Sequence, residues 1–91
     1  LVMEAMQAAA QNLGMSAEDA QLLVVQTALG AARLALESGE PAAELRRKVT
    51  SKGGTTEAAL KVLNDGGLPA LFEQALQAAA KRSRELAAAN Q

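Results

Sequence analysis

Residues 49–56 read Val-Thr-Ser-Lys-Gly-Gly-Thr-Thr, so two glycines and four hydroxyl side chains stand together just before a run with helical periodicity. The first amides of a helix have no partner within it, and the helix dipole favours negative charge at that end. Glycine also lets the backbone approach a ligand closely. These residues therefore predict a site for a small carboxylate or phosphate, held by Ser51 and the amides of Gly54, Thr55 and Thr56.

A plain helix cap is the competing interpretation of the same residues, because a threonine before a helix commonly serves as its N-cap. The order of residues is not that of a Walker A loop, since Lys52 precedes the glycines instead of following a Gly-x-x-x-x-Gly pattern. Both interpretations stay open on local sequence alone.

The composition restricts the available chemistry. The 91 residues contain no cysteine and no histidine, which removes thiolate metal sites, disulfides and the commonest general base. No metal site is expected, and catalysis would rely on hydroxyls, amides, carboxylates or a cofactor. The net charge of −1 and the single aromatic residue, Phe72, give no case for nucleic acid binding.

The elements that must position the loop are helices. Alanine occurs 22 times, and it has the highest helix propensity of all residues. The expected class is all-α, a bundle of about five helices. The first three are expected at residues 1–13, 16–38 and 41–48. The fourth is expected to begin at a Thr55 or Thr56 cap and to end near residue 65. The fifth is expected from residue 68 onward, with residues 87–91 frayed. Glu57 and Lys61 are expected to pair on the fourth helix.

The second helix predicts a partner chain. Ser16 opens it and Gly39 stops it, and its middle is apolar on nearly every side. A domain of this size cannot easily surround such a helix alone, so a dimer is expected. The longest charge-free stretch, 20–32, is too short to span a bilayer, and a cytoplasmic protein without membrane contact is the default expectation. The start at Leu1, within a helical pattern, suggests a fragment whose N-terminal part is absent.

The loop and its surroundings resemble the C-terminal dimerisation domain of pyrroline-5-carboxylate reductases. The matching residues span essentially the whole chain. They are the loop 49–56, then Ala59, Leu60, Leu63, Gly66 and Gly67, and the stretches 26–33, 36–40, 44–45 and 82–86.

The resemblance implies an enzyme that reduces 1-pyrroline-5-carboxylate to L-proline, the last step of proline biosynthesis, with NADPH or NADH. It implies a Rossmann domain, absent from this chain, that binds most of the cofactor, and it makes residues 1–91 the helical dimerisation and substrate-binding domain. The helical domains of two chains would form an interwoven homodimer, and these dimers would assemble further into a decamer. Ser51, Gly54, Thr55 and Thr56 would hold the substrate carboxylate, with the Thr56 hydroxyl near the imine nitrogen.

One residue departs from the family pattern. Lys52 stands where the family usually has proline, which gives up a fixed φ and adds a cation. Lys52 is expected to be solvent-exposed, although it could reach a carboxylate or a cofactor phosphate. The fragment alone is expected to be inactive. The alternative function is a non-catalytic helical oligomerisation or adaptor module, in which the loop is only a cap.

Overall fold

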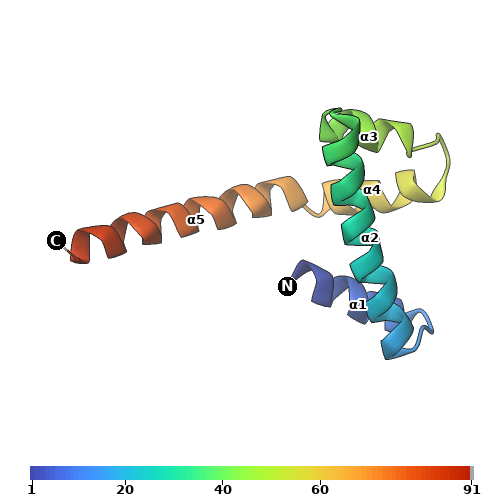
Figure 1. Ribbon diagram of the computed structural model, residues 1–91, viewed down its shortest axis with the longest axis horizontal. Helices are drawn as coiled ribbons and strands as arrows, with labels where there is room; N and C mark the ends of the chain where they lie inside the picture. The colour runs from blue at the N-terminus through green and yellow to red at the C-terminus, as the bar shows by residue number, and fades with distance from the viewer. Residues whose placement is uncertain (91) are drawn as a thin grey trace. The chain divides into compact units, whose positions relative to one another are not determined.

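Every regular element in the computed structural model is an α-helix, and the structure describes residues 1–90 (Figure 1). The expected all-α class with five helices is confirmed. The chain divides into two compact units, Leu1–Arg46 and a second that begins at Arg47. The helices are α1 (Val2–Asn12), α2 (Ala17–Ser38), α3 (Ala42–Lys48), α4 (Thr55–Asp65) and α5 (Leu68–Ala89).

The first unit is built on a helical hairpin. The chain leaves α1 through Gly14, which has a φ of +110°, and enters α2 after a short turn. The α1 helix then lies beside the N-terminal part of α2 (Figure 1). Ala20 and Val24 of α2 become buried, with 0% and 3% of their surface exposed. They are the buried hydrophobic residues of the described chain, so this core is small.

Local signals set both ends of α2, as predicted. The Ser16 side chain accepts a hydrogen bond from the Asp19 amide at 3.1 Å, which satisfies one of the unpaired donors at the helix start. Gly39 ends the helix in the left-handed region at a φ of +67°, where a side chain would be strained. The boundaries that the sequence predicted for this helix were therefore correct.

Large apolar side chains cover the rest of α2. Helical spacing places Leu22, Val25, Leu29 and Leu36 on one side, and each is exposed by 45% or more. Leu23 and Leu34 are exposed on another side, and a narrow polar stripe separates the two groups. The stripe consists of Gln26, Arg33 and Glu37. Such apolar surface is typical of a helix that is buried in an assembly.

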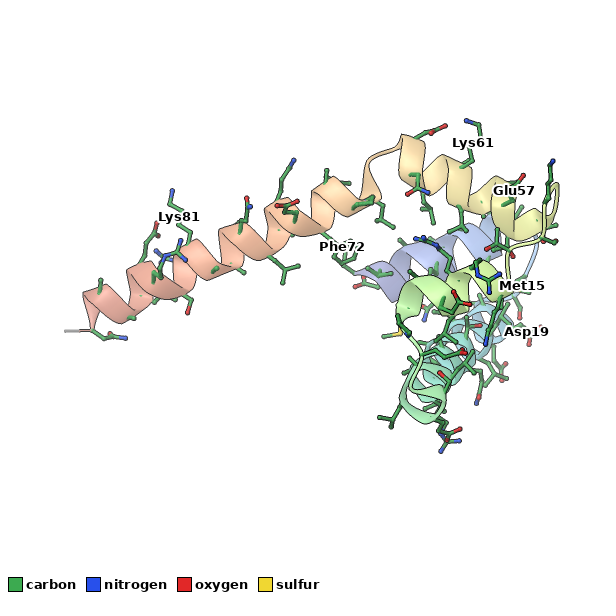
Figure 2. The ribbon with its side chains drawn as sticks, turned by 90° about the horizontal axis from the view of Figure 1, so that it is seen from above. Met15, Asp19, Glu57, Lys61, Phe72 and Lys81 are labelled. Atoms are coloured by element: carbon green, nitrogen blue, oxygen red, sulfur yellow. The ribbon has the colours of Figure 1, made fainter. Side chains whose placement is uncertain are left out.

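The second unit contains α4 and α5, which are joined at two glycines. The Gly66 amide donates to the Val62 carbonyl at 2.9 Å, and Gly67 turns the chain at a φ of +84°. Pro69 lies in the first turn of α5, as predicted. The helix then runs for 22 residues without a buried residue, and Phe72 and Lys81 project from opposite sides of it (Figure 2).

The expected fraying of α5 after residue 86 was wrong for the part that is described. The helix continues to Ala89, because residues 87–89 are alanines, with the highest helix propensity and no breaker among them. Gln91 lies outside the described residues. Within residues 1–90, no helix combines the length and the hydropathy that crossing a bilayer would require.

Candidate functional site at the start of helix α4

The loop between α3 and α4, residues 50–54, is shaped by a tight turn. The Gly54 amide donates to the Ser51 carbonyl at 3.0 Å, and Gly53 between them has a φ of +75°. No described residue other than glycine has a positive φ, so Lys52 lies in the ordinary region. That combination defines a type II turn with Lys52 in its second position and Gly53 in its third. We call residues 51–54 the type II turn.

Helix α4 starts one residue earlier than a threonine cap would require. Gly54 is the N-cap, with φ −85° and ψ 178°, and no side chain caps the helix. The prediction that Thr55 or Thr56 is the cap was therefore wrong. The turn explains the difference, because its closing bond places Gly54 at the helix entrance and both threonines inside the first helical turn. The threonines thus have no capping role.

Ser51 lies directly against Gly54. A Cβ atom built on Gly54 would collide with the Ser51 hydroxyl oxygen and would lie 3.1 Å from the Ser51 carbonyl oxygen. Only glycine leaves room for this approach, since it lacks the Cβ atom. The turn therefore brings the Ser51 side chain beside the first residues of α4.

Several polar groups at this helix start are without partners. Among residues 1–90, no group accepts a hydrogen bond from the amides of Thr55, Thr56 and Glu57. The hydroxyls of Ser51, Thr55 and Thr56 form no hydrogen bond within the same range. Ser51 and Thr55 are exposed, whereas Gly54 and Thr56 are half-buried. Three amides and three hydroxyls thus remain available at the positive end of the α4 dipole.

The Gly54 amide differs from its predicted role. It was expected to face the anion together with the amides of Thr55 and Thr56, but it is used to close the type II turn. The next amide along the helix, that of Glu57, is free instead. The amides without a partner at this helix start are therefore those of Thr55, Thr56 and Glu57.

The Glu57 side chain was assigned to the wrong partner. Its Oε1 atom accepts a hydrogen bond from the Gly53 amide at 3.1 Å, and Lys61 bonds Asp65 at 2.7 Å instead (Figure 2). In a capping box, a glutamate at the third helical position accepts the amide of the N-cap residue, and a Ser or Thr N-cap side chain bonds back to the helix. Here the N-cap is Gly54, and Glu57 accepts the amide one residue earlier, so the motif is absent. Sequence reasoning missed this role of Glu57, and its place in the first helical turn was the one signal for it.

The charged residues between Ser51 and the third residue of α4 are Lys52 and Glu57. Lys52 is exposed, as predicted, and Glu57 is bonded to the turn. No group of three or more acidic side chains that could hold a metal ion occurs in the described part of the chain.

An open hollow of about 330 Å³ lies along Glu18, Gln21, Leu22 and Val25 of α2. Because it is mostly apolar and formed by one helix, it belongs to the exposed face of α2 and not to the loop.

Comparison with known proteins gives the same family from sequence and from structure. Residues 1–86 match the family described as pyrroline-5-carboxylate reductase dimerisation. A pyrroline-5-carboxylate reductase of Pseudomonas aeruginosa is 58% identical over 87 residues, which are 96% of this chain and 32% of that protein. Pyrroline-5-carboxylate reductase 3 of Bos taurus is 42% identical over 83 residues, 91% of this chain and 27% of that protein.

A solved structure agrees with these relatives. A pyrroline-5-carboxylate reductase from Coxiella burnetii superimposes with a TM-score of 0.90 and 55% identity, over 93% of this chain and 32% of that one. The chain therefore spans about a third of the length of the proteins that it matches.

Proposed function

Because this chain belongs to the pyrroline-5-carboxylate reductase dimerisation family, we propose that it is the dimerisation and substrate-binding part of an enzyme that reduces 1-pyrroline-5-carboxylate to L-proline. The observation that supports this most directly is the start of α4, where three hydroxyls and three amides are free. A separate domain of the enzyme would bind the nicotinamide cofactor, NADPH or NADH. This chain would supply the groups that hold the substrate.

The substrate carboxylate fits the donors of this site. The free amides of Thr55, Thr56 and Glu57 converge at the positive end of α4, and the Ser51 hydroxyl lies beside them. Hydrogen bonds from such groups to a charged acceptor are about twice as strong as those between neutral groups. The N-terminal end of a helix is a common anion site for the same reason.

The reaction needs little from the protein besides positioning and a proton. When bound, the nicotinamide cofactor would supply a hydride to the carbon of the C=N bond. The nitrogen must be protonated before or during this transfer, so that the π electrons become a nitrogen lone pair and no nitrogen anion forms. One hydride and one proton are added in total. The Thr56 hydroxyl would form a hydrogen bond with this nitrogen and direct the proton to it. The contacts to the substrate carboxylate would hold the ring in place.

The reductase proposal is tested in the full-length enzyme that carries this chain. We expect oxidation of NADPH or NADH that depends on 1-pyrroline-5-carboxylate, and we expect L-proline to protect the residues around Ser51 and Thr56 from hydrogen exchange. A non-catalytic oligomerisation or adaptor module would show neither effect. Absence of turnover with both nucleotides, in a correctly assembled protein, would contradict the proposal.

Replacing Gly54 with alanine is expected to weaken substrate binding without unfolding the domain. The new Cβ would displace the Ser51 hydroxyl, which can rotate away, and would lie 3.1 Å from the Ser51 carbonyl oxygen, so the cost falls on the turn and on the site. Loss of one hydrogen bond to a carboxylate is worth about 1.5–3 kcal/mol, or roughly tenfold or more in KM. Ser51→Ala is the matched control and should raise KM by a similar factor. A large effect of G54A combined with none of S51A would refute this role of Ser51.

The remaining expectations from the sequence stay predictions. The family match supports assembly through this domain, and the exposed apolar faces of α2 are in keeping with a homodimer. Assembly of dimers into a decamer, the choice between NADPH and NADH, and a cytoplasmic location are part of the proposal and await measurement.

A further inference from the structure

Glu57 connects helix α4 to the type II turn. Its Oε1 atom accepts the Gly53 amide at 3.1 Å, so the third residue of the helix is bonded to the residue before its N-cap. We propose that Glu57 is a positioning residue: it holds the turn so that Ser51 and the free amides of α4 face the substrate carboxylate. This inference rests on the proposed function.

The turn has little intrinsic rigidity, which is why such a bond matters. Its central residues are Lys52 and Gly53, followed by Gly54. Glycine loses more conformational freedom on ordering than any other residue, and lysine does not restrict its own φ. Proline is favoured at the second position of a type II turn, because its ring presets φ near −65°. In this chain the hydrogen bond that Glu57 accepts from the Gly53 amide provides the constraint that a proline at position 52 would provide.

Proline would be compatible with position 52. Lys52 has a negative φ, and no hydrogen bond from its amide occurs among the described residues. A substitution to proline would therefore remove no bond and would reduce the freedom of the unbound loop. The Glu57 hydrogen bond and a proline at position 52 would constrain the same turn, so their effects on KM should not add.

An electrostatic role for Glu57 predicts the opposite result. A carboxylate near an anion site repels the substrate, so its removal would improve binding if charge were its main contribution. Glutamine separates the two roles, since it keeps an oxygen acceptor for the Gly53 amide and loses the charge. Under positioning, Glu57→Gln should resemble the wild type and Glu57→Ala should not. Under electrostatics, both neutral variants should bind the substrate more tightly.

The test is a double-mutant cycle in the full-length enzyme. We expect Glu57→Ala to raise the KM for 1-pyrroline-5-carboxylate about tenfold, with kcat changed less than about twofold, because one hydrogen bond to a charged group is lost. In the Lys52→Pro background the same substitution should change KM by less than about twofold. Lys52→Ala is the control for the lost cation, and in that background Glu57→Ala should keep its full effect. An equal effect of Glu57→Ala in the Lys52→Pro and wild-type backgrounds would overturn the proposal.

Hydrogen exchange of the segment that contains Gly53 separates this inference from the reductase proposal. Exchange of the Gly53 and Gly54 amides should accelerate in Glu57→Ala, and Glu57→Gln should slow both again. The added Lys52→Pro should slow exchange of the Gly54 amide, whose bond to the Ser51 carbonyl closes the turn, whatever the activity of the enzyme. If the wild type does not reduce the imine but shows these exchange changes, the function fails and the constraint by Glu57 stands. If the enzyme is active but neither KM nor exchange responds to Glu57→Ala, the inference about Glu57 is wrong.

Discussion

Replacement of Thr56 with valine or alanine is expected to lower kcat for 1-pyrroline-5-carboxylate about a hundredfold in the full-length enzyme. Thr56 is half-buried at the second position of α4, and its hydroxyl has no hydrogen-bond partner within the described chain. Positioned proton transfer typically contributes 10²–10⁴-fold to a rate. The amide of residue 56 remains in these variants, so the carboxylate contact and KM should change much less than kcat.

Three controls make the Thr56 prediction specific. Thr56→Ser retains a hydroxyl and should keep most of the turnover. Ser51→Ala should raise KM and leave kcat nearly unchanged, because Ser51 is assigned to the carboxylate alone. Sedimentation should show an unchanged assembly in all variants, since each substitution changes one small side chain outside the apolar faces of α2. Normal turnover of Thr56→Val would remove the hydroxyl from the mechanism.

Replacement of Leu29 with aspartate is expected to dissociate the dimer. Leu29 is 47% exposed in the single chain and lies on the apolar side of α2. Its burial in an assembly is worth about 1.5–3 kcal/mol, and an unpaired carboxylate in its place costs several kcal/mol more. A symmetric dimer contains the substitution twice. The dissociation constant should therefore rise by about a thousandfold or more, as measured by analytical ultracentrifugation.

Gln26→Asp provides the matched control on the same helix. It adds the same charge within the polar stripe, where Arg33 and Glu37 also lie, so the dimer should persist. If Leu29→Asp leaves a stable dimer at micromolar concentration, this side of α2 is not the dimer interface. If both variants dissociate, the interface extends across the stripe.

Local signals predicted most of the helical structure. Ser16, Gly39, Gly67 and Pro69 act on their own backbone and on neighbours within four residues, so their effects can be inferred without the rest of the fold. The start of α4 could not be placed as easily. There a turn closed by the Gly54 amide competes with a threonine cap, and the relative energies of the two depend on backbone geometry that the sequence does not display.

The partner of Glu57 illustrates a competition between local rules. Lys61 has an acidic residue four positions before it and another four positions after it, and the preferred order of charges favours the first. Glu57 instead accepts the amide of Gly53 in the turn before α4, and Lys61 bonds Asp65. A hydrogen bond to a backbone donor thus takes precedence over an exposed ion pair, which contributes little in water.

The small core of the single chain has a consequence for the proposed homodimer: its folding and its association become one equilibrium. Two buried hydrophobic residues, Ala20 and Val24, cannot balance the conformational entropy lost when a chain of 91 residues becomes ordered. In the proposed homodimer, most of the favourable free energy comes from surface that a second copy covers. The free energy of unfolding of this domain then depends on protein concentration, and a melting temperature has meaning only together with the concentration at which it is measured.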